Sequence, residues 1–149
     1  MANSNTTITV IGAGLTGPLV SVYLAQRGFS VDLYERRPDI RNTQIPAGRS
    51  INLALSKRGL FALENIGLGE SIKKMVIPMK GRMIHYKDGS LDFQPYGKDD
   101  SEMIYSISRA ELNRVLLSKA DEMEKVSIRF DAKCLQAELD QKFVIVEKN

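Results

Sequence analysis

Three glycines near the start of the sequence have the spacing of a loop that binds a dinucleotide. The run Gly12-Ala13-Gly14-Leu15-Thr16-Gly17 fits the pattern G-x-G-x-x-G. In such a loop the first glycine makes a tight turn, the second lets the backbone approach a pyrophosphate, and the third lets helix and strand pack closely. The N–H groups that begin the following helix would then face the phosphates. A glycine-rich turn without a ligand is the alternative that the loop alone leaves open.

Glu35 has the position of a carboxylate that binds a ribose. It lies 18 residues after Gly17, close to the spacing at which an acidic residue meets ribose hydroxyls in dinucleotide-binding folds. Because a carboxylate would repel a 2′-phosphate, Glu35 favours FAD or NAD over NADP as the bound nucleotide. Taken alone, it could equally be a solvated charge at the end of a strand.

The segments around these residues predict the elements that would position them. Residues 7–11 are all β-branched, which is typical of a buried strand that Gly12 ends. Apolar residues at helical spacing predict a helix from Leu15 to a C-terminal cap at Gly28, and residues 30–35 alternate as a second strand does. A helix that joins two strands in this way makes them parallel. The sequence therefore predicts a βαβ unit.

Between this unit and the middle of the chain the sequence predicts a loop and two helices. Residues 36–50 are rich in Arg, Pro, Asn and Gly with little periodicity, which is typical of a surface loop. Ser56 is expected to cap a helix that closes at Gly67. A shorter helix is expected over 70–75, ended by Pro78.

The middle of the chain predicts an antiparallel hairpin. Residues 82–86 and 91–93 flank Asp88-Gly89, and an Asp-Gly pair supplies the positive φ angles of a tight turn. We expect residues 103–107 to add a third strand to this group.

The last part of the chain predicts a helix and three strands. The helix is expected from Ser108 through Lys119, followed by a strand at 126–130 and a closing hairpin of 134–139 and 143–147. The parallel sheet then has too few strands to be complete. The predicted fold class is α/β, a Rossmann-like βαβ unit with an antiparallel hairpin insertion that forms part of a larger domain.

Composition excludes several classes of protein. The 149 residues are 43% hydrophobic, enough for the core of one domain, and the net charge of +3 is scattered without a basic block, which argues against nucleic-acid binding. No stretch has the length of a membrane span or the pattern of a signal peptide. With one cysteine there is no internal disulfide, so we expect a cytoplasmic protein. One His and one Cys argue against a metal site, and we interpret His85 as structural and Cys134 as no nucleophile.

Further motifs resemble a known family. They are Gly48-Arg49-Ser50-Ile51-Asn52-Leu53-Ala54-Leu55-Ser56, Arg82-Met83-Ile84-His85, Pro95-Tyr96-Gly97, and Ser106-Ile107-Ser108-Arg109 with Leu112-Asn113. In this order they resemble the kynurenine 3-monooxygenases, a family of FAD-dependent aromatic hydroxylases, and they span most of the chain. The resemblance implies an enzyme that binds FAD, takes electrons from NADPH and uses O2 to hydroxylate the ring of L-kynurenine. It implies no catalytic side chain here, because the flavin supplies the chemistry.

The resemblance also implies roles for individual residues. Together with the loop residues Gly12, Gly14, Leu15, Thr16 and Gly17, the residues that it places at FAD are Tyr34, Glu35, Arg36, Arg37, Ala54, Arg109 and Cys134. Arg82 and Tyr96 would hold the amino-acid end of the substrate, since a guanidinium pairs with a carboxylate through two hydrogen bonds and a phenol adds a directed donor. Without the resemblance, both would be interpreted as structural. Arg49 could reach a phosphate or a nicotinamide cofactor, or neutralise nearby acids.

Three parts are expected in the chain: residues 1–75 with the βαβ unit and its helices, 79–107 with the strands on the substrate side, and 108–149 with a helix and the return strands. Later Gly-Asp and Asp-Gly motifs of the family are missing, since the one Asp-Gly pair is the hairpin turn at Asp88-Gly89. We therefore expect these 149 residues, about the front third of such an enzyme, to be inactive alone. Apolar surface at the unfinished sheet would favour self-association.

Two other hypotheses remain open. The chain could be a nucleotide-binding fragment that needs a partner chain with the missing motifs. It could also be an NAD-dependent dehydrogenase or a flavin reductase, which would explain the glycine loop and Glu35 but not the Arg82 motif.

Overall fold

The chain folds into two compact units, seen in a computed structural model that describes residues 6–43, 51–99 and 101–148. The first unit contains the described residues before 51 and after 109, and the second contains those from 51 to 109. Each unit is described by itself.

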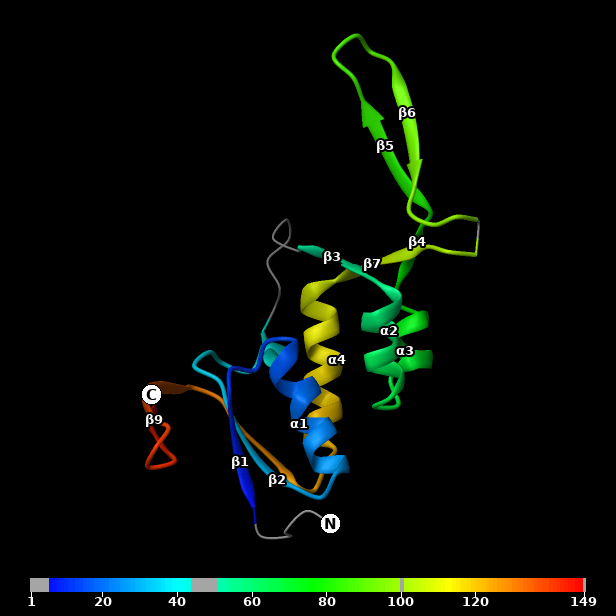
Figure 1. Cartoon of the computed structure of the whole chain (residues 1–149). Coiled ribbons are helices and arrows are strands. Elements are labelled where there is room, and N and C mark those ends of the chain that lie inside the picture. The colour runs from blue at the N-terminus through cyan, green and yellow to red at the C-terminus, as the bar shows by residue number, and fades with distance from the viewer. Residues whose placement is uncertain (1–5, 44–50, 100, 149) are drawn as a thin grey trace. The chain divides into compact units, whose positions relative to one another are not determined.

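A three-stranded parallel sheet with two helices makes up most of the first unit (Figure 1). Its elements are β1 (Thr7–Ile11), α1 (Thr16–Gln26), β2 (Ser30–Tyr34), α4 (Arg109–Asp121), whose first residue is counted with the second unit, and β8 (Val126–Arg129). The strand order is β1-β2-β8, and both pairs are parallel. The chain moves in one direction along this sheet, from β1 to β2 and then to β8. Right-handed crossovers in one direction place their helices on the same face of a sheet. The predicted βαβ unit is confirmed, but the expectation that its first strand is buried is wrong. The residues of β1 alternate between exposed and half-buried, because β1 is an edge strand of the sheet.

The end of α1 shows why the chain turns back after this helix. Gly28 has a φ of +93°, a left-handed conformation that suits glycine. Its N–H donates to the carbonyl of Ala25 at 2.9 Å, and the N–H of Phe29 donates to Leu24 at 3.2 Å. These two bonds form a Schellman motif, so the predicted helix end at Gly28 is confirmed.

The core of the first unit lies beneath the glycine loop. Ala13, Leu33 and Leu117 are buried together, and partly buried apolar side chains pack against them, namely Val10, Ile40, Ile128 and Phe130. Burying this apolar surface stabilises the contact between the loop, β2 and α4. The loop is therefore anchored in the core through Ala13, while Gly12 and Gly14 are only half-buried.

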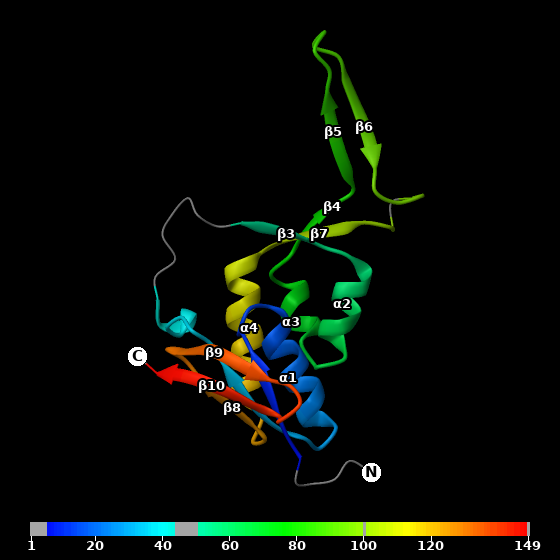
Figure 2. The ribbon, with the colours of Figure 1, turned by 60° about the vertical axis from the view of Figure 1, so that its left-hand side comes forward.

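Two smaller elements complete the first unit. A 3-10 helix, η1 (Ile40–Asn42), follows β2, and the hairpin of β9 (Ala132–Glu138) and β10 (Phe143–Lys148) follows β8. In Figure 2 this hairpin lies in front of the sheet, and β9 contacts β2. The closing hairpin predicted from the sequence is confirmed.

The second unit contains two helices and two small antiparallel sheets. Its elements are β3 (Asn52–Leu55), α2 (Lys57–Glu64), α3 (Gly69–Lys73), β4 (Ile77–Met79), β5 (Gly81–His85), β6 (Leu91–Pro95) and β7 (Ile104–Ser108). Strand β7 lies between β3 and β4, while β5 and β6 pair with each other and with no other described strand. Its core is formed by buried side chains of α2, α3, the turn between them and the β3-β7-β4 sheet: Leu55, Leu63, Ile66, Leu68, Ile72 and Ile107.

Two predictions for this unit are wrong. Strand β7 does not join the hairpin but pairs with β3 and β4, because the hairpin offers no buried face, whereas Ile107 and Leu55 are both buried. Pro78 does not end a helix, since α3 already ends at Lys73 and Pro78 lies in β4. A proline has no N–H to donate, so an edge strand such as β4 tolerates it.

The hairpin turn is confirmed, but its two central residues act differently from the prediction. Within the described turn only Gly89 has a positive φ, of +85°. Asp88 contributes through its side chain, which accepts hydrogen bonds from the N–H and the hydroxyl of Ser90 at 3.0 and 2.7 Å. The Gly89 N–H donates to Tyr86 at 3.0 Å and closes the turn.

Candidate nucleotide-binding site

The glycine loop has the backbone geometry that the motif predicts. Gly12 has a φ of +95°, and its N–H donates to the carbonyl of Tyr34 at 2.7 Å. A Cβ on Gly17 would overlap the carbonyl of Gly12, whereas a Cβ on Gly14 would have no described heavy atom within 4 Å. Gly17 is therefore required for packing, and Gly14 leaves open space beside the backbone.

The start of α1 presents backbone donors that its own side chains do not neutralise. Leu15 occupies the N-cap, where its side chain cannot accept a hydrogen bond, and Thr16 begins the helix. The first turn of this described helix carries no acidic residue. Since the first N–H groups of a helix have no partner within it and carry partial positive charge, this end favours an anion.

Glu35 directly follows β2, and its carboxylate is held by four donors. Oε2 accepts from the N–H of Ala13 at 2.8 Å and from Nη2 of Arg37 at 3.3 Å. Oε1 accepts from the N–H and Nε of Arg37 at 2.9 and 2.8 Å. The Glu35 side chain is only 7% exposed, so the glycine loop and the segment after β2 meet at a buried charge.

These contacts determine the direction in which the pKa of the Glu35 carboxyl group is shifted. Burial acts to raise its pKa, but the hydrogen bonds from the side chain and N–H of Arg37 and from the N–H of Ala13 outweigh burial and lower the pKa below its ordinary value. The same pairing raises the pKa of Arg37. The Arg37 side chain is 62% exposed, so it covers the carboxylate from the solvent side.

A cavity of about 430 Å³ brings most of the predicted cofactor residues together. Its lining residues are Ile11, Gly12, Gly14, Tyr34, Glu35, Arg36, Arg37, Ala132, Lys133 and Cys134. The open side of the glycine loop, the end of β2 and the start of β9 thus form one surface. Ala132 and Lys133 were not predicted, because nothing in their residue types distinguishes them from the rest of a strand.

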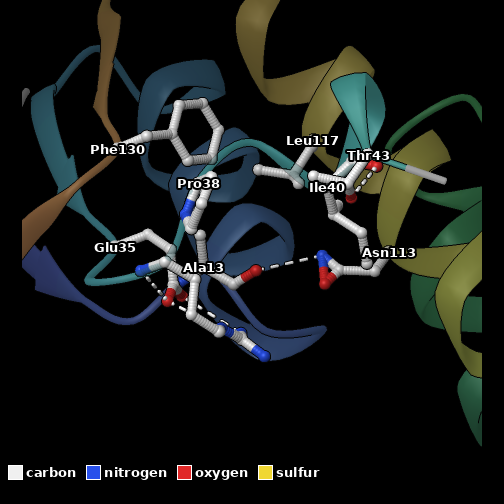
Figure 3. A pocket seen from close by; sticks show the side chains of 9 residues that line it. Ala13, Glu35, Pro38, Ile40, Thr43, Asn113, Leu117 and Phe130 are labelled. Atoms are coloured by element: carbon white, nitrogen blue, oxygen red, sulfur yellow. Dashed lines mark hydrogen bonds and ion pairs between the residues drawn. The ribbon is translucent and has the colours of Figure 1, made fainter. Parts of the chain in front are cut away.

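A second cavity of about 230 Å³ shares Glu35 and Arg37 with the first (Figure 3). Its other lining residues are Ala13, Pro38, Ile40, Thr43, Asn113, Leu117 and Phe130. Here Nδ2 of Asn113 donates to the carbonyl of Ala13 at 3.0 Å. Asn113 was part of a recognised motif but received no role; a polar residue between buried positions of a helix is the signal that could have identified it.

The remaining predicted residues belong to the second unit. Ala54 lies in β3, and Arg109 begins α4 with its N–H donating to the carbonyl of Ile51 at 3.0 Å. Arg82 lies in β5, where its Nε and Nη2 donate to Oε1 of Gln94 at 3.1 and 2.8 Å. Tyr96 follows β6.

Arg82 and Tyr96 lie on the same face of the β5–β6 hairpin. Arg82 is directly opposite Gln94, and the N–H of Tyr96 continues the ladder by donating to Lys80 at 2.8 Å. Because alternate residues of a strand share a face, Gln94 and Tyr96 point to the same side. Both Arg82 and Tyr96 are exposed and available to a ligand.

The positions of Cys134 and His85 in the structure assign neither residue a catalytic role. Cys134 lines the first cavity, and its thiol donates to the carbonyl of Gln136 at 3.6 Å. His85 is exposed in β5. No cluster of three potential metal ligands is found among the described residues, and none of their helices is long and apolar enough to span a membrane. Arg49 and the start of its motif lie outside the described residues.

Comparison with solved structures places this arrangement among known folds. The p-nitrophenol 4-monooxygenase PnpA of Pseudomonas putida DLL-E4 matches with a TM-score of 0.72 at 20% identity, over 93% of this chain and 36% of that one. A 2-methyl-3-hydroxypyridine-5-carboxylic acid oxygenase matches with a TM-score of 0.75 at 17% identity, over 96% of this chain and 38% of that one. At such identities the likeness shows the fold alone.

Sequence comparison gives closer relatives. The kynurenine 3-monooxygenase of Myxococcus xanthus (strain DK1622) is 56% identical over 124 residues, which are 83% of this chain and 27% of that protein. The kynurenine 3-monooxygenase of Legionella pneumophila (strain Corby) is 44% identical over 140 residues, 94% of this chain and 31% of that protein. The chain thus spans less than a third of the length of these relatives. Residues 5–147 match the family described as FAD binding domain, and the chain belongs to that family.

Proposed function

We propose that this chain is the FAD-binding part of a monooxygenase that hydroxylates L-kynurenine with NADPH and O2. The observation that carries the proposal is the cavity that joins the open glycine loop to Glu35, in a chain whose relatives are named for this activity. The likeness of the Arg82 and Tyr96 motifs to that family supports the choice of substrate.

The described residues fit the adenosine and pyrophosphate portion of FAD. Gly12 and Gly14 leave the backbone bare beside the start of α1, where N–H groups would hold the pyrophosphate. Leu15, Thr16 and Gly17 shape that helix start. Tyr34, Arg36, Arg37 and the backbone of Cys134 would surround the adenosine, and in the second unit Ala54 and Arg109 would contact the cofactor.

Glu35 would bind the ribose, but its carboxylate is already saturated. A carboxylate has about four lone-pair positions, and four donors occupy them in this structure. A ribose hydroxyl would take the place of the weakest donor, Nη2 of Arg37 at 3.3 Å. Because Arg37 is mostly exposed, its side chain can withdraw without disturbing the core.

Arg82 and Tyr96 would hold the amino-acid end of the substrate from one face of the hairpin. The Arg82 guanidinium is oriented by Gln94, which leaves other N–H groups of Arg82 for a carboxylate. Bound FAD would supply the oxidative chemistry. The part of these residues is to bind and orient, and no side chain of this chain is proposed as catalytic. The parent enzyme would take electrons from NADPH in the cytoplasm.

The nucleotide is tested by titrating the 149-residue chain with FAD, NAD and NADP and following flavin fluorescence and protein stability. We expect FAD alone to bind and to raise the melting temperature, since a ligand that binds only the folded state stabilises it. Preferential binding of NAD would instead favour a dehydrogenase.

The activity is tested in two steps. The 149-residue chain is expected to show no kynurenine-dependent NADPH oxidation, and observing it would contradict that expectation. A chimera in which this segment replaces its counterpart in the Myxococcus xanthus enzyme should hydroxylate L-kynurenine. A chimera that binds FAD but leaves kynurenine unchanged would refute the proposed substrate.

Self-association is a further part of the proposal. Large apolar side chains of the two hairpins are more than 40% exposed, namely Met83, Leu91, Phe93, Leu135, Leu139, Phe143 and Ile145. Exposed apolar surface of this kind favours association. Sedimentation analysis should therefore show oligomers whose share grows with concentration, and a monomer with one sharp melting transition would count against it.

A further inference from the structure

We propose that Asn113 and Glu35 together clamp the backbone of Ala13 and so hold the glycine loop in the shape that receives a pyrophosphate. In this Asn113–Glu35 clamp, Asn113 is a positioning residue for FAD rather than a ligand of it. The inference deepens the proposed FAD binding and rests on it.

The clamp holds the backbone N–H and the backbone carbonyl of Ala13. Ala13 is only 2% exposed. Its N–H donates to Oε2 of Glu35 at 2.8 Å, and its carbonyl accepts from Nδ2 of Asn113 at 3.0 Å (Figure 3). All three residues are buried, so losing either bond would leave a poorly solvated polar group of the Ala13 backbone.

The loop needs such a clamp because of its own composition. Ala13 stands between Gly12 and Gly14, and glycine is the residue with the most conformational freedom to lose on folding. The glycines that let a pyrophosphate approach the backbone therefore also raise the conformational entropy that the loop loses when it is ordered. Fixing Ala13 on both sides fixes the peptide groups on either side of it, which lowers the ordering cost of binding.

Asn113 acts through Ala13 and not on a nucleotide directly. It is absent from the residues that line the cavity beside Gly12 and Gly14. It lies on α4, 100 residues away in sequence from Ala13, and lines the second cavity, which shares Glu35 and Arg37 with the first. The clamp thus couples the position of α4 to the shape of the loop.

The chemistry requires an amide at position 113. A carbonyl can only accept, so its partner must donate. Asp has nearly the shape of Asn but would place a carboxylate oxygen against the Ala13 carbonyl, and Leu would leave that carbonyl buried without a partner. Both changes remove the donor and keep the approximate volume.

The test compares Asn113→Leu and Asn113→Asp with two controls in the 149-residue chain. Lys125→Met removes another long-range bond to the backbone, from Nζ of Lys125 to the carbonyl of Gly28 at 2.9 Å, at a place away from the loop. Leu116→Ala removes a buried side chain from the same helix and matches the loss of stability. Amide hydrogen exchange of residues 10–17 and the dissociation constant for FAD are measured for all five proteins.

We expect both Asn113 variants to exchange faster over residues 10–17 and to bind FAD about tenfold more weakly, the loss that one buried hydrogen bond corresponds to. Lys125→Met should keep the exchange and the FAD affinity of the unmodified chain. Leu116→Ala should speed exchange over residues 10–17 no more than elsewhere in the first unit. Unchanged exchange over the loop in the Asn113 variants, or an equal change in Leu116→Ala, would overturn the clamp.

The exchange measurement needs no flavin, so the two proposals fail differently. If the unmodified chain does not bind FAD, the proposed function is wrong while faster exchange in the Asn113 variants would still support the clamp on the loop. If FAD binds equally to the chain and to both Asn113 variants, FAD binding stands and the positioning role of Asn113 is wrong.

Discussion

The backbone N–H of Ala13 donates a hydrogen bond of 2.8 Å to the carboxylate of Glu35 across 22 residues of sequence. This bond joins the glycine loop directly to the residue that follows β2. The acidic residue of the motif therefore has a structural task besides the ribose contact proposed for it. A substitution at Glu35 that abolishes flavin binding would by itself not prove contact with the flavin, and stability must be measured beside affinity.

Acid should destabilise the first unit through Glu35. Its folded pKa lies below the ordinary value of 4.5, so its contribution to stability is complete above about pH 4.5 and is lost as the pH falls through the folded pKa. Urea unfolding between pH 3 and pH 7 should show this loss.

The matched variant for this experiment is Glu35→Gln, which cannot titrate. It should be less stable than the unmodified chain at pH 7 by about 1–3 kcal/mol, because its NH₂ group faces donors in place of an acceptor. Asp39, whose pKa is also lowered by Arg41 despite its burial, remains in both proteins. The difference between the two curves should therefore shrink below pH 4.5, and a constant difference would contradict the role of the Glu35 charge.

Local patterns predicted the first unit well because its elements follow from short stretches of sequence. The β-branched run before Gly12, the helical spacing up to Gly28 and the alternation after Ser30 each specify one element, and the handedness of the crossover then fixes their arrangement. The same holds for Glu35, which its distance from the glycines identified. Its bond to Ala13 was not predicted, because a buried hydrogen bond depends on side-chain geometry that spacing does not contain.

Strand pairing in the second unit was harder to predict because neighbours in sequence need not pair. Residues 104–108 follow the hairpin along the chain, yet β7 pairs with β3 some 50 residues earlier, where Ile107 and Leu55 can be buried. Asn113 was missed for a related reason. A single polar residue on a helix gains a meaning only when the structure shows which carbonyl it meets.

Arg82 should govern substrate affinity but not flavin affinity. In the Myxococcus xanthus chimera, Arg82→Met should weaken L-kynurenine binding by at least about tenfold, since a charge-assisted pair with the substrate carboxylate would be lost. Equilibrium titration measures both ligands. Lys87→Met, a change of charge near the exposed tip of the same hairpin, is the control and should leave both affinities intact. Equal kynurenine binding by Arg82→Met and the unmodified chimera would remove Arg82 from the site.

The hairpin turn should depend on Gly89 through its backbone alone. A Cβ at this position would meet no described heavy atom within 4 Å, but the φ of +85° is unfavourable for alanine. Gly89→Ala should therefore destabilise the hairpin by about 1–2 kcal/mol, seen as faster amide exchange in β5 and β6. Gly89→Asn should cost less, because asparagine tolerates a left-handed backbone. Equal exchange rates in the two variants would show that the turn does not impose this conformation.

Gly14 and Gly17 should respond differently to the same added methyl group. A Cβ on Gly17 would overlap the carbonyl of Gly12 and lie 3.3 Å from a methyl group of Leu33, so Gly17→Ala should force helix and strand apart and lower both the melting temperature and FAD affinity. Gly14→Ala has room in the protein and should melt close to the unmodified chain, yet lose FAD affinity, since the methyl group enters the space proposed for the pyrophosphate. Thermal unfolding and FAD titration of both variants separate a packing glycine from a binding one. If Gly14→Ala kept its affinity for FAD, the pyrophosphate would have to bind elsewhere than beside Gly14.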